Sequence, residues 1–99
     1  MDNLSEKIRA RFDHEAAKQV LREKYEAKLL FAHQGGMFRA TSDLIVLLSS
    51  YGEDQMMVVD EYGTPVLVDR VSLLQEAKQR NQEQLNAWAV ELADIRNQR

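Results

Sequence analysis

The side chains that could do acid–base or metal chemistry in this 99-residue chain are few and widely spaced. Its two histidines, His14 and His33, need partners three or four positions away to bind a metal from one helix. Arg11 and Lys18 stand at those spacings from His14, and both cations disfavour a metal. We expect His33 to cap the last turn of a helix, where a cation is favoured. Neither histidine is predicted to be a ligand or a base.

Three other groups of residues each match only part of a known site. The pair Gly35-Gly36 follows a predicted helix and lacks the nearby lysine of a phosphate-binding loop. Asp60, Glu61 and Asp69 lack the alternating spacing of a calcium loop. No serine stands in a G-x-S-x-G motif, and the absence of cysteine excludes thiolate metal sites and disulfides. We therefore expect no enzyme, no cofactor and no metal site.

The charged side chains are unevenly distributed along the chain, whose formal net charge is −3. Residues 41–70 hold six acidic residues and one basic residue, a balance that would repel a phosphate backbone. A nucleic-acid interface would therefore have to use the N-terminal basic residues. These are Lys7, Arg9, Arg11, Lys18, Arg22, Lys24 and Lys28. Acidic residues lie between them, which favours a solvated helix face with i,i+4 ion pairs.

A long helix is predicted from Asn3 to Gln34, ended by the glycine pair that follows. Asn3 and Glu6 have the spacing of a capping box. At 1.5 Å per residue the helix would be about 45 Å long, so part of it should project or pack on something else. Its apolar stripe consists of Leu4, Ile8, Phe12, Ala16 and Val20, continued by Leu21, Tyr25, Leu29 and Ala32.

The middle of the chain predicts a small antiparallel sheet. Met56–Val59 and Val66–Val68 flank a loop in which Gly63 can take a positive φ, so they form a hairpin. Pro65 suits a strand start, where no donor is needed. Residues 37–40 are a candidate third strand, because an isolated hairpin is marginally stable in water.

Residues 42–51 allow two interpretations. Leu44, Leu47, Leu48 and Tyr51 have helical spacing, and Thr41 or Ser42 could cap the start. The unbroken apolar run from 44 to 48 also suits a buried strand, which would add a strand to the sheet. We favour the helix.

A second long helix is predicted from Ser72 to the end of the chain. Ser72 and Gln75 form a capping box at the start of this helix. Its seam has the 3.5-residue repeat of a coiled coil. The seam residues are Leu74, Lys78, Asn81, Leu85, Trp88, Leu92 and Ile95. Asn81 either sets the register of an oligomer or lies at the edge of an ordinary amphipathic helix.

Together these patterns predict one α+β domain over residues 1–99: a long N-terminal helix, a small bent antiparallel sheet of three to five strands, and a long C-terminal helix. The composition, 44% hydrophobic and 29% charged, is ordinary for a globular protein. The apolar runs are too short to span a bilayer and the N-terminus has no apolar signal core. We expect a cytoplasmic protein without membrane contact.

The chain also bears two resemblances to known families. The segments Gly35–Ala40, Asp60–Val66 and Val68–Arg70 resemble small uncharacterised proteins of contractile-tailed phages of marine cyanobacteria and of marine metagenomes. This resemblance implies a phage accessory, assembly or regulatory protein with no assigned activity.

The second resemblance is architectural and covers residues 1–70. A helix followed by short, bent strands is similar to the Sm/Lsm-like fold, whose subunits form RNA-binding rings. That family has an Asp-x-apolar-apolar-Asn motif, and here neither Asp43 nor Asp60 has the matching Asn. The family's RNA pocket is therefore not transferred to any residue of this chain.

The leading hypothesis is a non-enzymatic, self-associating assembly module, a homo-oligomer that pairs helices or joins sheet edges. The expected anchors are Leu85, Trp88, Leu92 and Ile95, with Leu21, Tyr25 and Leu29 as a second patch. The same Trp88 face could instead complete the core of the domain. The alternative hypothesis is an Sm/Lsm-like ring that binds RNA through the N-terminal basic residues.

Overall fold

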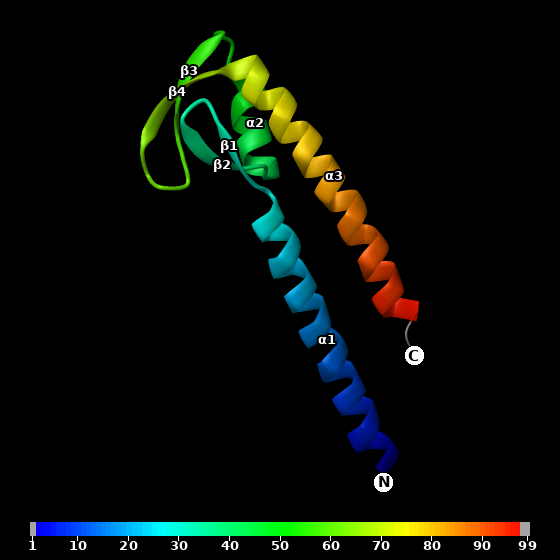
Figure 1. Ribbon diagram of the computed structural model, residues 1–99. Helices are drawn as coiled ribbons and strands as arrows, with labels where there is room; N and C mark the ends of the chain where they lie inside the picture. The colour runs from blue at the N-terminus through cyan, green and yellow to red at the C-terminus, as the bar shows by residue number, and fades with distance from the viewer. Residues whose placement is uncertain (1, 98–99) are drawn as a thin grey trace.

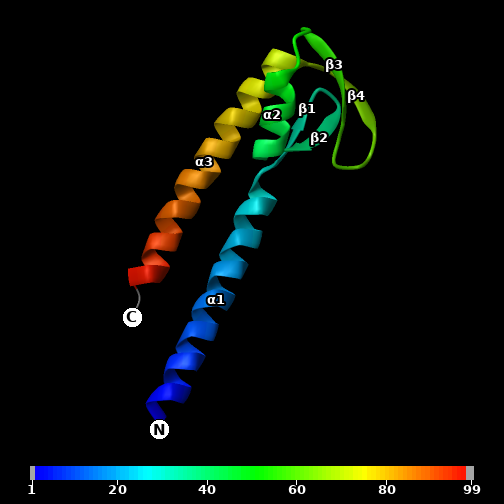
Figure 2. The ribbon, with the colours of Figure 1, turned by 180° about the vertical axis from the view of Figure 1, so that it is seen from behind.

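The computed structural model describes the backbone of residues 2–97, and the side chains of residue 11 and residues 13–97. The elements are α1 (Asp2–Lys28), β1 (Leu30–His33), β2 (Gly36–Arg39), α2 (Ser42–Ser50), β3 (Gln55–Val59), β4 (Pro65–Asp69) and α3 (Arg70–Asn97). The strands and α2 form a head, from which α1 and α3 extend as a two-helix arm (Figure 1). The view from behind shows the same head and the same two-helix arm (Figure 2).

The molecule is elongated, as the length of the predicted N-terminal helix implied. Its principal extents are 63 × 24 × 21 Å and its radius of gyration is 18.5 Å. A compact domain of this size has a radius of gyration of about 13 Å. Most of α1 therefore lies outside the head, where it runs beside α3.

The α+β class is confirmed, but the strands do not form the single bent sheet that the sequence predicted. They form two separate antiparallel pairs, β1 with β2 and β3 with β4. The two hairpins meet through loop contacts: Met37 N–H donates to the Asp60 carboxylate (3.1 Å), and Glu61 N–H donates to the Met37 carbonyl (2.8 Å). Because a loop occupies the free edge of β2, no ladder forms between the hairpins.

The prediction that the first helix continues to Gln34 is wrong, because α1 ends at Lys28 and the chain turns into β1. Gln34 and Gly35 form the two-residue turn of the β1–β2 hairpin, with φ of 46° and 85°. Positive φ at both positions is what a tight hairpin turn of this kind requires. Gly35 therefore lies in a hairpin turn and Gly36 begins β2, so the glycine pair does not end a helix. The candidate strand at 37–40 is confirmed as β2, with β1 as its partner.

The apolar stripe predicted for the first helix is confirmed only in part. Its members Leu21, Tyr25 and Leu29 are buried, whereas Ala16, Val20 and Ala32 are exposed, and Ala32 lies in β1. The first three members of that stripe, Leu4, Ile8 and Phe12, lie outside the described side chains. On α3 the predicted seam is also shifted in the head: Lys78 is exposed, and Leu73 and Ala77 are fully buried instead.

Residues 42–50 are helical, so the favoured interpretation is confirmed. Thr41 caps α2, because its hydroxyl accepts a hydrogen bond from Leu44 N–H (3.2 Å). The predicted capping box at Ser72 is wrong: α3 begins at Arg70, and the Asp69 carboxylate accepts from Ser72 N–H (3.0 Å). Asp69 ends β4 and caps α3, so strand and helix join without a loop.

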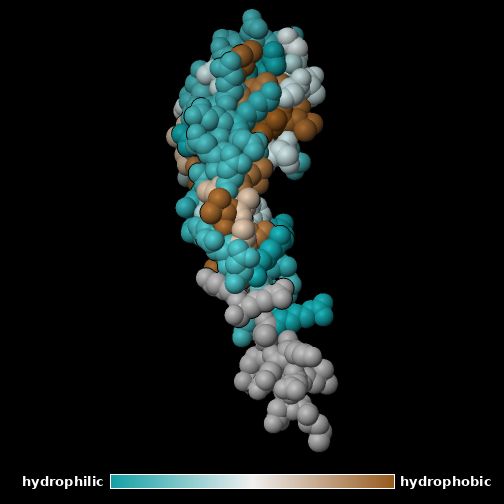
Figure 3. Space-filling view, turned by 90° about the vertical axis from the view of Figure 1, so that its right-hand side faces the viewer, coloured by the Kyte–Doolittle hydropathy of each residue, from teal (hydrophilic) through white to brown (hydrophobic). Residues whose placement is uncertain are grey.

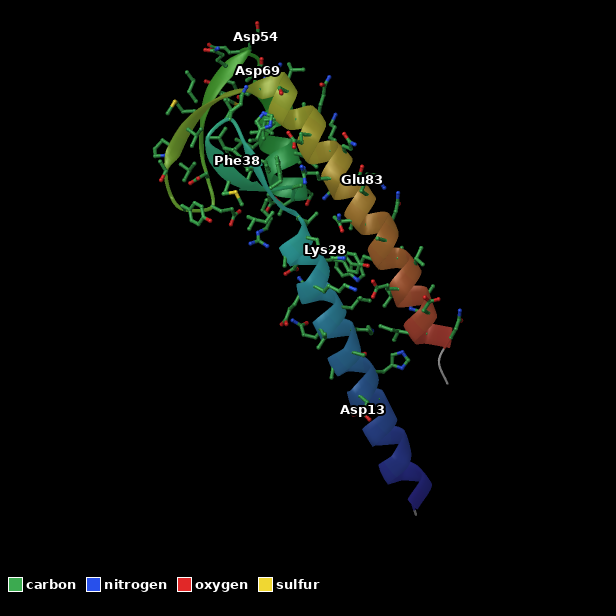
Figure 4. All side chains as sticks on the ribbon, in the orientation of Figure 1. Asp13, Lys28, Phe38, Asp54, Asp69 and Glu83 are labelled. Atoms are coloured by element: carbon green, nitrogen blue, oxygen red, sulfur yellow. The ribbon has the colours of Figure 1, made fainter. Side chains whose placement is uncertain are left out.

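The core of the head lies between the two hairpins, α2 and the first turns of α3. Phe38, labelled in Figure 4, lies at the centre of this core and is 2% exposed. The buried residues of this cluster are Leu29, Phe31, Phe38, Ala40, Leu48, Met56, Val58, Val68, Leu73 and Ala77. The confirmed β3–β4 hairpin contributes only its inner side chains to this core.

Candidate interaction surfaces

The arm is held together by an aromatic contact between its two helices. The rings of Tyr25 and Trp88 stack with centroids 6.2 Å apart and planes 3° apart. Tyr25 is 3% exposed and Leu21 is also buried, whereas Trp88 is half-buried. Stacked aromatic pairs add about 0.5–1.5 kcal/mol beyond the area they bury. Trp88 therefore joins α3 to α1 within one chain.

A polar cluster flanks this aromatic contact. The carboxylate of Glu91 accepts hydrogen bonds from the Tyr25 hydroxyl and from the Lys24 ammonium, the latter at 2.8 Å. The hydrogen bond from Lys24, followed by the one from Tyr25, lowers the pKa of Glu91. The hydrogen bond to Glu91 raises the pKa of Tyr25, because it favours the protonated phenol. This cluster sets the register of α1 against α3.

The side of the predicted α3 seam that faces away from the Tyr25–Trp88 contact is open. Leu85 is 42% exposed, and Leu92 and Ile95 are half-buried. Trp88 and Leu92 line a surface groove of about 240 Å³ between the two helices. The groove is bordered by polar residues of α1, namely Glu15, Lys18, Gln19 and Arg22. Among the side chains that the structure describes, α1 therefore covers the seam on one side only.

The predicted interface residues fall into two groups. Leu21, Tyr25 and Leu29 are buried by contacts within the chain, so they do not form a free second patch. Leu85, Trp88, Leu92 and Ile95 lie along one exposed or half-exposed line on α3. Only the second group is available to a partner in this conformation.

His33 lies on β1 and not in a helix, so its predicted capping role is wrong. Its Nδ1 lies 2.6 Å from Glu76 of α3, and its Nε2 lies 3.5 Å from the Ser72 hydroxyl. Burial raises the pKa of Glu76, but the hydrogen bonds from His33 and then Arg80 outweigh it, so that pKa is lowered overall. The His33 side chain is 10% exposed.

The order hydroxyl, imidazole, carboxylate is that of a nucleophile, its base and the group that orients the base. The Ser72–His33 distance, however, lies at the limit of a hydrogen bond. The second carboxylate oxygen of Glu76 pairs with Arg80 at 3.1 Å, which shares the negative charge that would support an imidazolium. The geometry favours a tether between β1 and α3 over a reaction centre.

Most of the basic residues named for nucleic-acid binding are already engaged. Lys18 pairs with Glu15 (3.2 Å) and Arg22 with Glu26 (2.9 Å), as predicted for a solvated face with paired charges. Lys24 binds Glu91, and the Lys28 ammonium lies 5.0 Å from the centre of the Tyr25 ring. Arg11 is exposed, and the side chains of Lys7 and Arg9 lie outside the described residues.

The head carries a second exposed apolar area, on the outer face of the β3–β4 hairpin. Met57 and Leu67 face each other in the register and are 57% and 55% exposed. Val59 and Pro65 form the neighbouring exposed pair. On the side of the molecule that Figure 3 shows, hydrophobic atoms gather over part of the head and in a smaller area along the arm.

Sequence reasoning did not identify this outer face or the His33–Glu76 contact. The first had a signal, because Met57 and Val59 alternate with the buried residues of β3, an uncharged strand between two acidic pairs. The second had none, because 43 positions separate His33 from Glu76.

Among residues 2–97, no group of three or more His, Asp or Glu side chains with described positions is arranged to hold a metal ion. None of the described helices is long and apolar enough to cross a membrane. Comparison with family models, curated proteins and solved structures found no match to this chain.

Proposed function

We propose that this protein is a non-enzymatic assembly module of the cytoplasm that self-associates through its arm. The observation that carries the proposal is the half-covered seam on α3, where Leu85, Trp88 and Leu92 remain accessible beside α1. The occupant is a second copy of the chain, because the residue spacing is that of a coiled-coil seam. A two-helix arm covers one side of such a seam, and a second arm would complete a bundle.

The energetics are modest for each residue and add up because a symmetric dimer uses the same patch twice. Burying the exposed part of Leu85 contributes about 1 kcal/mol per subunit, since full burial of a leucine contributes about 1.5–3 kcal/mol. The Leu92 and Ile95 side chains extend the same line toward the end of the arm. The resemblance to phage proteins remains a prediction and would make the module a phage accessory protein.

The test is the solution mass by light scattering across protein concentrations. Leu85→Glu should lower the mass toward 11.4 kDa, because a carboxylate on the seam opposes its burial. Val90→Glu is the matched control, since Val90 is 63% exposed on the same helix but lies off the seam. Circular dichroism should show unchanged helix content in both variants.

The result that contradicts the proposal is a wild-type protein that stays monomeric at every concentration. Equal effects of the two variants would also contradict it, because the seam would then have no special role. Trp88→Ala is less informative, because Trp88 also stacks on Tyr25 within the chain.

The same measurement tests the alternative, an Sm/Lsm-like ring that binds RNA. A ring that takes up a short single-stranded RNA at low salt and releases it at high salt would favour the alternative. The ion pairs on Lys18, Arg22 and Lys24 reduce the positive charge available for RNA, so the assembly module is better supported.

A further inference from the structure

The open edge of β3 is a second unpartnered surface, and the hydrogen bonds at the two ends of the β3–β4 ladder define it. Asp60 N–H donates to the Thr64 carbonyl (2.9 Å), and Arg70 N–H donates to the Asp54 carbonyl (2.7 Å). In an antiparallel pair, residues alternate between pointing their backbone groups toward the partner strand and away from it. In β3, the residues whose backbone N–H and C=O groups point away from β4 are therefore Gln55, Met57 and Val59.

The edges of β3 and β4 differ in how they are protected. On β4, Pro65 has no N–H group, and the Gln34 side chain accepts a hydrogen bond from Asp69 N–H (2.8 Å). On β3, the outward N–H and C=O groups form no hydrogen bond to any other element within the described part of the chain. Charges, prolines and covering loops are what usually protect an edge strand. Between Gln55 and Val59, the β3 edge carries none of these.

The side chains beside this edge are apolar. Met57 and Val59 lie on the outer face of the hairpin, next to Leu67 and Pro65 of β4. A strand added at the edge would hydrogen-bond to three alternate residues of β3 and place alternate side chains on this apolar face. An extended segment can therefore use both the polar edge and the apolar face.

Acidic residues lie at both ends of the edge. Glu53 and Asp54 precede β3, and Asp60 and Glu61 follow it. In Figure 4, Asp54 lies at the end of the head that is farthest from the tip of the arm. The Arg39 guanidinium lies 3.6 Å from the Glu61 carboxylate and offsets part of its negative charge. Most of the unpaired negative charge at the two ends therefore comes from Glu53, Asp54 and Asp60. The two ends are thus negative and the middle is uncharged.

This charge pattern opposes pairing of β3 with a second copy of itself. A symmetric antiparallel pair centred on Met57 would place Asp54 opposite Asp60 of the second copy, and Glu53 opposite Glu61. Like charges directly across two strands are destabilising. The favoured strand is one whose ends carry the opposite charge.

We propose that the β3 edge binds an extended segment of another protein, with lysine or arginine at both ends and β-branched or other apolar residues between them. The segment adds as a third, antiparallel strand next to β3. This site is separate from the seam on the arm, so it stands whether or not the protein self-associates.

The experiment uses the full chain and a synthetic nine-residue peptide, KRVTVTVRK, with blocked ends. The control is the peptide EDVTVTVDE, which has the same centre and the opposite ends. Amide hydrogen exchange is followed residue by residue by NMR. We expect the basic peptide to slow exchange at Gln55, Met57 and Val59 and to leave Met56 and Val58 unchanged, because these two already face β4.

Three variants separate the edge, the face and the charge. Met57→Pro removes one outward N–H without touching the β3–β4 ladder, and it should weaken binding by about tenfold or more. Leu67→Lys alters the same face on β4 and should weaken binding less. The double variant Glu53→Gln with Asp54→Asn should weaken binding about two- to 25-fold, since each of the two exposed ion pairs contributes a factor of about 1.5–5. Arg70 contacts only the backbone carbonyl groups of these two residues, so those contacts are retained.

Several outcomes would overturn the proposal. One is that neither peptide binds, and another is that both bind equally well. A stronger effect of Leu67→Lys than of Met57→Pro would place the ligand on the face and not at the edge. In the protein without peptide, exchange at Gln55, Met57 and Val59 that becomes slower as the protein concentration increases would show that a second copy covers the edge.

Discussion

Asn81 provides the sharpest test of how α3 is held against the head. Its side-chain amide donates to the carbonyl of Ala40 at 2.8 Å, and Ala40 is fully buried. That carbonyl has no other hydrogen-bond partner among the described residues. Asn81→Ala would therefore leave a buried acceptor unsatisfied, while the helix itself could continue unchanged.

The expected loss of stability follows from two opposing terms. An unsatisfied buried carbonyl costs about 1–3 kcal/mol, and the better helix propensity of alanine offsets about 0.5 kcal/mol. A net loss of about 1.5 kcal/mol lowers the melting temperature of a domain of this size by about 6–12 °C. The assay is urea unfolding followed by circular dichroism, together with a thermal scan.

Asn86→Ala is the matched control on the same helix. Asn86 is exposed, and its only hydrogen bond among described groups is a long one from Gln82 (3.4 Å). The control therefore has the same gain in helix propensity without the buried loss. The reasoning is refuted if Asn81→Ala is as stable as Asn86→Ala. A changed oligomer mass at unchanged stability would instead show that Asn81 sets the register of an assembly.

Two further predictions concern the hairpins of the head. Gly36→Ala should destabilise the protein by about 1–3 kcal/mol in urea unfolding, because the added Cβ would lie 2.8 Å from a ring carbon of Phe38. Gly52→Ala, whose Cβ would meet nothing within 4 Å, is the control, and equal losses would contradict this explanation. Backbone hydrogen bonds, first that of Thr64, lower the pKa of Asp60, so its ionised form stabilises the fold above the unfolded pKa of about 3.9. That contribution is lost as pH falls through the folded pKa, so Asp60→Asn should be less stable than wild type at pH 7, with a difference that shrinks in acid. A difference independent of pH would disprove the assignment.

The elements that could be predicted are those whose signals are local. The β3–β4 hairpin follows from two apolar runs around a loop with Gly63, and α2 follows from helical spacing after a capping threonine. In both cases neighbouring residues supply the capping or turn geometry. Both long helices were predicted for the same reason, although their ends were not placed correctly.

The ends were misplaced where two local signals competed. Leu29 and Ala32 continue a helical stripe, yet residues 30–33 form β1 because β2 offers a partner strand across a two-residue turn. Ser72 and Gln75 have the spacing of a capping box, yet Asp69 caps α3. Local propensity is similar for the competing arrangements, so packing against the rest of the head decides between them.

The candidate surfaces show the same division. The 3.5-residue seam on α3 is visible in the sequence, but its partial cover by α1 is not, because the stacking of Tyr25 on Trp88 joins residues 63 positions apart. The uncharged strand between acidic pairs is also visible in the sequence. Which edge of the β3–β4 hairpin is open is not visible there, because Gln34 binds the outward N–H of Asp69 on β4 from 35 positions away, and β3 has no such contact among the described residues.

The amino-acid sequence by itself determined the absence of cysteine chemistry, the acidic middle of the chain, the β3–β4 hairpin, and helices too long for a compact domain. These are properties of composition and of short-range spacing. The tertiary structure alone decided that His33 meets Glu76, that Asn81 meets Ala40, and that one strand edge stays open. Each of these features depends on how segments far apart in the sequence pack together, and no spacing along the chain encodes that packing.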